Sequence, residues 1–168
     1  MKEINTTTTY SEEVVKKFLH IFYFEKIKKI RILVNLLIIA IIIYFIQEDQ
    51  RSTIDYITFG FALFGIIELN SSFLPWLNFY KLKMRRDKIL NSKVKYTFKK
   101  NNFKINLNKD EYINYKDLKK VIEVETAYYL YIDNSKAFIV SKENLSKEQI
   151  NNLTNIFKEK ISTYKYKK

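Results

Sequence analysis

Few side chains in this sequence are of the types that carry out chemistry. It has a single histidine, His20, and no cysteine, which excludes disulfides, thiolate metal sites and cysteine nucleophiles. A histidine acts as a base or a ligand only beside a positioned partner group. On the amphipathic helix expected here, its neighbours are Lys16, Lys17 and Phe24, so we interpret His20 as a surface or interfacial residue.

The acidic residues have plain structural roles in the sequence pattern. Glu123 and Glu125 would share one face of a strand, and Glu12 and Glu13 would begin a helix. The two glycines, Gly60 and Gly65, do not provide a glycine-rich phosphate loop, a dinucleotide-binding fingerprint or a nucleophile elbow. We therefore expect no enzyme, no metal site and no cofactor.

Two nearly continuous apolar runs, Ile32–Ile46 and Ile54–Leu69, follow each other in a chain whose net charge is +12. A helix on the surface of a soluble protein shows a polar stripe, but the only polar interruption of the first run is Asn35. A membrane span needs about 20 apolar residues, and flanking residues extend the first run towards that length. We predict a transmembrane hairpin over residues 31–80, with spans at about 31–47 and 55–74.

The alternative is a soluble helical hairpin buried in a protein core. Two helices that are apolar all round would then need to be covered by the rest of the chain, which is rich in lysine. The length and uniformity of the apolar runs favour the membrane.

Asn35 interrupts the first apolar run, and Glu68 lies near the end of the second. A carboxylate inside a membrane is by default a hypothesis of a proton or ion site, so these two residues form a candidate intramembrane polar site. The simpler interpretation places Glu68 at the cytoplasmic interface, since Asn70, Ser71 and Ser72 follow it closely.

Basic residues lie on both outer flanks of the hairpin, whereas the connector Gln47–Asp55 has a net negative charge. Cytoplasmic flanks of membrane spans carry an excess of lysine and arginine, so we expect both termini in the cytoplasm, at the plasma membrane. The basic side chains would contact anionic headgroups. They are Lys28, Lys29, Arg31, Lys81, Lys83, Arg85 and Arg86.

The segments around the hairpin show other periodicities. We expect a strand and an amphipathic helix in residues 1–30, with the helix breaking near Glu25 before the first span. A helix from about Pro75 to Leu90 would carry a basic juxtamembrane segment, residues 81–92.

Residues 93–168 are expected to form a cytoplasmic β-rich domain with a C-terminal helix. Apolar residues alternate with polar ones in six segments, which predicts half-buried strands. Ser146 and Gln149 have the spacing of a capping box at the start of a final helix, and Lys165, Lys167 and Lys168 would form a frayed tail. The six strands centre on Val94–Phe98, Phe103–Leu107, Tyr112–Tyr115, Val121–Val124, Tyr128–Ile132 and Ala137–Val140.

One strand before the hairpin, Ile4–Thr9, brings the total to seven, with one helix at the end. This is the set of elements in a pleckstrin-homology-like β-sandwich. The predicted fold class is therefore α+β, a membrane protein whose two-helix transmembrane hairpin is inserted after the first strand of such a sandwich.

Several segments resemble the YcxB-like family of small bacterial membrane proteins. They include the basic stretch Tyr80–Arg86, then Tyr115–Val121, Tyr129–Ile132 and Lys136–Lys142. The chain departs from the family pattern at Ser141, where the family tends to have proline, and at Leu145, where it tends to have an aromatic residue. The resemblance implies a membrane-anchored, pleckstrin-homology-like cytoplasmic domain, and it supplies no catalytic residues.

Three functions suit this organisation. The first is a non-enzymatic, membrane-anchored interaction module that binds anionic headgroups and an unidentified protein partner. The second is self-protection, or immunity, against a membrane-active toxin or bacteriocin. The third is a small transporter subunit that uses Asn35 and Glu68 and lines its pore by homo-oligomerisation. We do not expect nucleic acid as a partner, because the basic residues are spread along membrane-adjacent positions.

Overall fold

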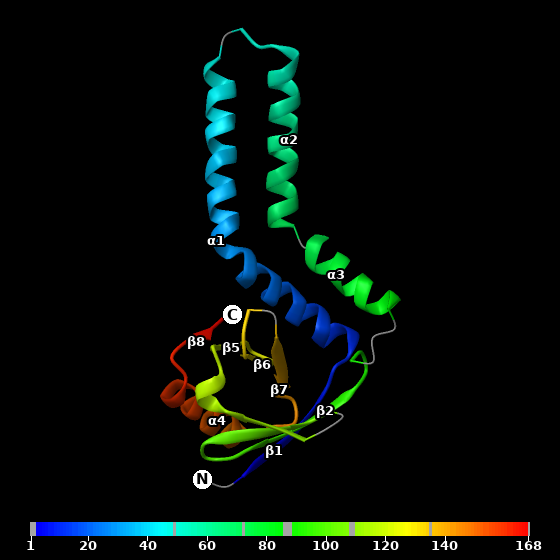
Figure 1. The fold of residues 1–168 in the computed structure, drawn as a ribbon, viewed down its shortest axis with the longest axis vertical. Coiled ribbons are helices and arrows are strands. Elements are labelled where there is room, and N and C mark those ends of the chain that lie inside the picture. The colour runs from blue at the N-terminus through cyan, green and yellow to red at the C-terminus, as the bar shows by residue number, and fades with distance from the viewer. Residues whose placement is uncertain are drawn as a thin grey trace. The chain divides into compact units, whose positions relative to one another are not determined.

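The computed structural model describes residues 3–48, 50–71, 73–85, 89–107, 110–134 and 136–167. The chain divides into two compact units (Figure 1). The β unit comprises Met1–Phe18 and Arg86–Lys168, and the hairpin unit comprises Leu19–Arg85. This organisation confirms the α+β prediction of long apolar helices combined with a β-rich body and a C-terminal helix.

The first helix, α1 (Glu12–Gln47), begins in the β unit and continues through the first apolar run. The predicted break near Glu25 is therefore wrong: α1 is a single helix, although its ribbon bends part-way along (Figure 1). Neither proline nor glycine occurs between Glu12 and Gln47. The backbone hydrogen bonding of α1 is consequently not interrupted at the transition from amphipathic to apolar sequence.

The second apolar helix, α2 (Thr53–Asn70), begins at a capping box between Ser52 and Asp55. Its C-cap residue is Ser71, whose backbone is extended. The expected span of about 55–74 is thus shortened at its end. Side chains such as that of Ser52 bond the free N–H groups of a first helical turn, which explains why α2 starts here.

The helix expected from Pro75 to Leu90 is α3 (Phe73–Met84). It ends earlier than expected, and the left-handed Asn91, with a φ of 64°, precedes the next strand. Of the basic juxtamembrane helix expected at 81–92, Lys81 and Lys83 occupy the last turn of α3, and residues 89–92 are not helical. Ser72, Arg86, Asp87 and Lys88 lie outside the described residues.

Small and aromatic residues bring α1 and α2 together. A Cβ atom added to Gly65 would lie 3.3 Å from Cδ1 of Ile38, so glycine permits a close approach of the two helices. Phe45 stacks on Phe59 with a centroid distance of 4.2 Å. The apolar side chains on the outer surface of the two helices are not covered by other residues: Leu36, Phe61 and other large apolar side chains are exposed.

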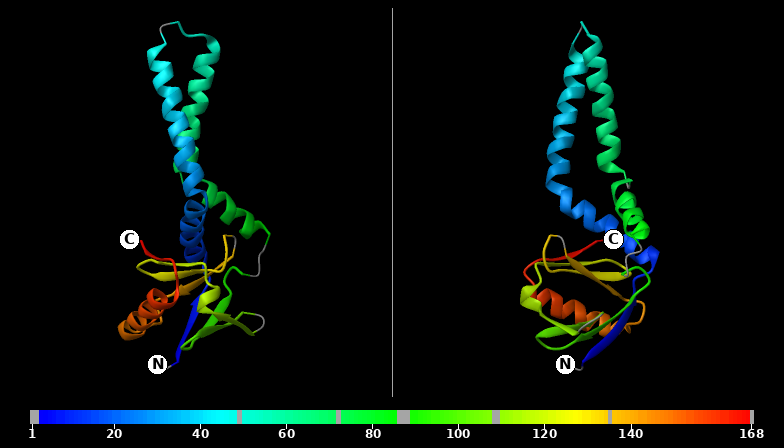
Figure 2. Two further views of the ribbon diagram at one scale, coloured as in Figure 1. Left: turned by 60° about the vertical axis from the view of Figure 1, so that its left-hand side comes forward. Right: turned by 45° about the vertical axis from the view of Figure 1, so that its right-hand side comes forward.

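The β unit contains two four-stranded sheets (Figure 2). All seven predicted strands are present, and the strand β1, which precedes the hairpin unit, pairs directly with β2, which follows it. The first sheet has the order β1 (Ile4–Thr9), β2 (Lys93–Phe98), β3 (Asn102–Asn106), β4 (Asp110–Asn114). The second has the order β7 (Ala137–Ser141), β6 (Ala127–Tyr131), β5 (Lys120–Glu123), β8 (Tyr164–Tyr166).

An eighth strand corrects the prediction of a frayed C-terminal tail. Strand β8 pairs in parallel with β5, where Val121 N donates to Thr163 O and Lys167 N donates to Glu123 O, each at 2.9 Å. The unpaired backbone groups on the edge of β5 provide the template for this strand. Lys168 lies outside the described residues.

The helix α4 (Lys147–Lys160) begins at the predicted capping box. Ser146 N donates to Gln149 Oε1 at 2.9 Å, and Gln149 N donates to Ser146 Oγ at 3.2 Å. A strong apolar stripe on α4 includes Leu153, Ile156 and Phe157, all buried.

Phe157 lies at the centre of the core and joins the two sheets. Its ring is fully buried and has centroid distances of 6.0 Å to Phe98 of the first sheet and 5.2 Å to Tyr128 of the second. Aromatic pairs at such separations add to the free energy of burial. The aromatic residues of β2 and β6 are therefore core residues.

Side chains of β1 and of the residue that follows it also hold the edge of the second sheet. Ser141 N, on β7, donates to Thr8 Oγ1 at 2.9 Å, and Ile139 N donates to the Tyr10 hydroxyl at 3.0 Å. Tyr10 and Tyr96 share a further hydrogen bond between their hydroxyls. The backbone N–H groups of an edge strand thereby gain partners that a neighbouring strand would otherwise provide.

Buried tyrosines make the β unit sensitive to alkali. Burial raises the pKa of Tyr128 and of Tyr129 from 10.0 to about 12. Both groups stay neutral in the folded chain at pH values where they ionise in the unfolded chain. Their contribution to the free energy of unfolding is complete below about pH 10 and is lost as the pH rises towards about 12.

We expect the free energy of unfolding of the full chain in detergent to fall between about pH 9 and about pH 12. Urea titration followed by circular dichroism, with tyrosinate absorbance in parallel, measures this change. Tyr129→Phe, which removes one of these groups, is expected to lose less stability over the same interval. An unchanged free energy across the interval would contradict the assignment of these tyrosines to the core.

Candidate functional site

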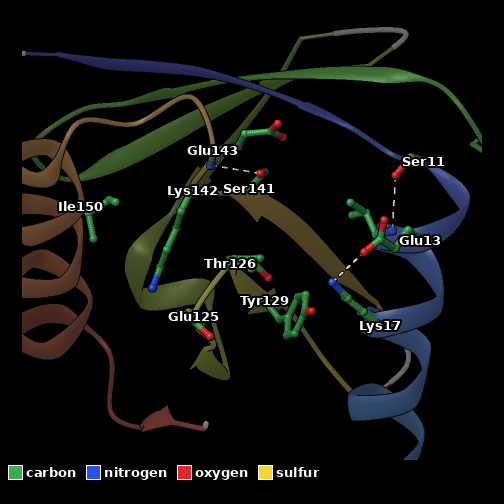
Figure 3. Close-up of a pocket in the computed structure, with 12 residues that line it drawn as sticks. Ser11, Glu13, Lys17, Glu125, Thr126, Tyr129, Ser141, Lys142, Glu143 and Ile150 are labelled. Atoms are coloured by element: carbon green, nitrogen blue, oxygen red, sulfur yellow. Dashed lines mark hydrogen bonds and ion pairs between the residues drawn. The ribbon is translucent and has the colours of Figure 1, made fainter.

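A pocket of about 670 Å³ opens on the β unit (Figure 3). Its walls come from the first turns of α1, the turn between β5 and β6, the end of β7 and the segment leading into α4. Segments distant in the sequence thus meet at one place. The lining side chains that the argument uses are Glu13, Lys17, Glu125, Tyr129, Lys142 and Glu143.

One residue that lines the pocket, Lys142, forms a buried ion pair with Glu123. Lys142 Nζ donates to Glu123 Oε1 at 2.6 Å and to Val124 O at 2.7 Å, and the side chains of Lys142 and Glu123 are each 9% exposed. Thr154 Oγ1 donates to the other carboxylate oxygen of Glu123 at 3.3 Å. A buried pair with these additional hydrogen bonds compensates for the loss of hydration of both charges.

The ion pair changes the interpretation of two acidic residues. Glu123 is on β5 and is buried in the pair, whereas Glu125 lies in the exposed turn after the strand. The two glutamates therefore do not share a strand face, because β5 ends at Glu123. The backbone turns at residues 125–126 before β6 begins.

The hydroxyl of Tyr129 has no hydrogen-bond partner within the part of the chain that the structure describes, although the residue is only 2% exposed. Its ring packs against Phe18 with a centroid distance of 5.3 Å. Figure 3 shows the hydroxyl directed towards the side of the pocket formed by Lys17. The oxygen is not among the buried side-chain atoms that lack a partner, so it is accessible from the pocket and can bond a bound molecule.

The rim of the pocket is acidic. Glu13 forms an exposed ion pair with Lys17 at 2.8 Å. Glu125 and Glu143 form no ion pair within residues 3–48, 50–71, 73–85, 89–107, 110–134 and 136–167. Two unpaired carboxylates and a free hydroxyl can together bind an ammonium or guanidinium group.

The predicted basic residues occupy two regions of the hairpin unit. Lys28, Lys29 and Arg31 follow one another on α1, where Arg31 lies over the Phe24 ring at 4.8 Å. Exposed side chains at the end of α3 form the other region, Lys81, Lys83 and Arg85. Arg86 lies outside the described residues.

The two residues of the candidate intramembrane site do not bond each other among the described contacts. Asn70 Nδ2 donates to Asn35 Oδ1 at 3.4 Å and, more closely, to Ile66 O at 2.8 Å. Asn35 is thus bonded by Asn70, a residue the sequence had placed with the interfacial cluster. Over the described part of the chain, no three metal-binding side chains gather in one place.

Sequence reasoning did not find the pocket. Lys142 stands at the end of the segment Lys136–Lys142 and Tyr129 begins the segment Tyr129–Ile132, so both lay in the stretches that carry the family resemblance. Their separation along the chain gave no sign that they line one pocket with α1.

Residues 98–157 match the family model for YcxB-like protein. This match confirms the resemblance predicted from the sequence. The YcxB-like segment runs from the end of β2 into α4. It contains Tyr129 and Lys142 of the pocket lining and Glu123, which pairs with Lys142. No curated protein and no solved structure matched the chain significantly.

Removing one partner of the buried pair should destabilise the fold strongly. Lys142→Met leaves the Glu123 carboxylate buried without a cation, and we expect the free energy of unfolding to fall by about 3–5 kcal/mol. The double variant Lys142→Met/Glu123→Leu should recover most of this loss, because it leaves no buried charge. Chemical denaturation of the full chain in detergent measures both.

The matched control is Lys17→Met, which breaks the ion pair between Lys17 and Glu13. The side chain of Lys17 is 56% exposed and that of Glu13 is 77% exposed. That substitution should cost less than about 1 kcal/mol. A loss for Lys142→Met no larger than for Lys17→Met would refute the role assigned to the buried pair.

Proposed function

We propose that this protein is a non-enzymatic interaction module anchored in the plasma membrane, with both termini in the cytoplasm. The observation that carries the proposal is the exposure of the apolar helices. α1 and α2 are long and apolar enough to cross a membrane. In each helix, only 6% of an 18-residue apolar stretch is buried. A core helix of a soluble protein would be mostly buried.

Individual side chains illustrate the exposure. Leu36 is 60% exposed and Phe61 is 72% exposed. Large contiguous apolar surfaces are rare on soluble proteins and mark contact with membranes or partners. Lipid chains would cover this apolar surface along both helices, while the backbone N–H and C=O groups bond one another within each helix.

The charges support an orientation with both flanks inside. Lys28, Lys29 and Arg31 precede the main apolar run, and Lys81, Lys83 and Arg85 follow α2. Lysine and arginine favour the cytoplasmic side of spans, where anionic lipids attract them. Trp76 and Tyr80, stacked at 5.6 Å and exposed, have the amphipathic rings typical of the interface.

The β unit is proposed to be a pleckstrin-homology-like sandwich. The order β1–β7 in two sheets, with α4 after β7, supports this assignment. The helices of the hairpin unit stand in the chain between β1 and β2, so the membrane anchor would be an insertion after the first strand. β8 would be an addition to the seven-stranded arrangement.

The acidic pocket is proposed as the partner site of the module. Glu125, Glu143 and the Tyr129 hydroxyl favour a positively charged group on that partner, such as a lysine or arginine side chain. An acidic pocket is selective in this chain, because the net charge of +12 otherwise repels basic ligands.

The absence of cysteine from the sequence makes a topology experiment clean. Gln50→Cys places a thiol in the connector between α1 and α2, and Asn151→Cys places one on the exposed side of α4. In intact cells, a membrane-impermeant thiol reagent should label the first variant and leave the second unlabelled until the cells are opened. Labelling of Asn151→Cys in intact cells would overturn the orientation.

A lysine-rich peptide probe tests the pocket in the full chain reconstituted in neutral nanodiscs. We expect Glu125→Gln/Glu143→Gln to weaken binding about 5–10-fold, as two solvated ion pairs are lost. The matched control Glu148→Gln/Glu159→Gln removes two exposed acids of α4 outside the pocket and should change binding less than about twofold. Equal weakening by both pairs would indicate a diffuse charge effect and contradict a pocket site.

A further inference from the structure

The hairpin unit contains a second hollow, a groove of about 520 Å³ between the first part of its α1 segment and α3. Both helices contribute one face. Residues 19, 22, 23, 26 and 27 of α1 and residues 78, 81, 82 and 85 at and just beyond α3 have the spacing of a single helical face. They are Leu19, Phe22, Tyr23, Lys26, Ile27, Asn78, Lys81, Leu82 and Arg85.

The groove is amphipathic. Its apolar lining includes Leu19, Ile27 and Leu82, and its cations are Lys26, Lys81 and Arg85. These three cations form no ion pair with any described residue, and all three are exposed. Three like charges around one apolar groove repel one another unless an anion lies between them.

The groove also lies next to the apolar run along the chain. Lys26 precedes Ile32 by six residues, which is about 9 Å along a helix. Lys81, on α3, and Arg85, just beyond it, follow the exposed aromatic residues Trp76 and Tyr80. In the proposed orientation, this is the level of the headgroups and the first acyl carbons on the cytoplasmic side.

We propose that this groove binds one anionic phospholipid. Lys26, Lys81 and Arg85 bind its phosphate, and the apolar lining takes the upper part of an acyl chain. The charge complementarity and the apolar floor together select this occupant, because a free phosphate would leave the floor empty and a neutral lipid would leave the cations unpaired. The inference rests on the proposed membrane anchoring and adds a defined lipid site to it.

The geometry divides the basic residues predicted from the sequence into two classes. Lys81 and Arg85 line the groove, and Lys26 joins them from α1, whereas Lys28 and Lys29 do not line it. Lys28 and Lys29 are exposed residues of the same unit. They therefore provide a matched control that removes the same charge from residues outside the groove lining.

The test uses the full chain in nanodiscs of phosphatidylcholine, alone or mixed with phosphatidylglycerol. Native mass spectrometry after release into detergent counts the phosphatidylglycerol molecules retained per chain. We expect the wild-type chain to retain one, and Lys81→Gln/Arg85→Gln to bind it about 30-fold more weakly. Lys28→Gln/Lys29→Gln should bind within about threefold of wild type, since its charges contribute only to diffuse attraction.

Three outcomes would overturn the lipid site. They are equal weakening in both double variants, retention unaffected by Lys81→Gln/Arg85→Gln, and displacement of the lipid by soluble glycerol phosphate, which would make the site one for phosphate alone. Circular dichroism of each variant checks that the helices remain. Extraction of the wild-type chain from vesicles by alkaline carbonate would instead refute the membrane anchoring itself, so the two failures are distinguishable.

Discussion

The apolar surface of the hairpin unit is the constraint on which the other features of this protein depend. Leu33, Phe61 and Phe64 are each at least 60% exposed, and water would penalise such a surface at roughly 25 cal/mol for every Å². In the proposed membrane location, lipid would remove that penalty, and the helices would satisfy the backbone polar groups that lipid cannot. The basic residues at both flanks and the aromatic residues of α3 would then lie at the headgroups.

The β unit joins the two strands that flank the hairpin unit in the chain. β1 and β2 are separated in the chain by all three helices of the hairpin unit, yet they pair along their whole length from Ile4–Phe98 to Thr9–Lys93. Thr8 and Tyr10 then bond the edge of the second sheet. The chain therefore leaves the β unit and re-enters it at neighbouring strands, which gives the hairpin unit two covalent attachments to one hydrogen-bonded sheet.

The two hollows have opposite charge and suit different partners. The pocket of the β unit combines unpaired carboxylates with the hydroxyl of Tyr129, which favours a cationic group. The groove of the hairpin unit combines an apolar floor with three cations, which favours an anionic lipid. Under the proposed function, one site would bind the membrane and the other a soluble partner. The YcxB-like segment contains part of the lining of the first site, including Glu125, Tyr129 and Lys142, and none of the lining of the second.

The amino-acid sequence alone determined the elements that depend on local periodicity. The uncharged run Ile32–Ile46, the alternation of Val94, Tyr96 and Phe98 with polar residues, and the Ser146–Gln149 capping box each specify a structure within a few residues. Helix ends were less well predicted: α2 ends at Asn70 rather than at about residue 74, and α1 continues past the break expected near Glu25.

Only the tertiary structure decided which of these elements meet. The pairing of β8 with β5, the burial of Glu123 beside Lys142, and the convergence of Lys26 with Lys81 and Arg85 join residues far apart in the chain. A periodic pattern specifies which face of a helix or strand is apolar, but it does not specify which other helix or strand packs against that face. Burial, ion pairing and the shape of a pocket arise from that choice, which is made by packing across the whole fold.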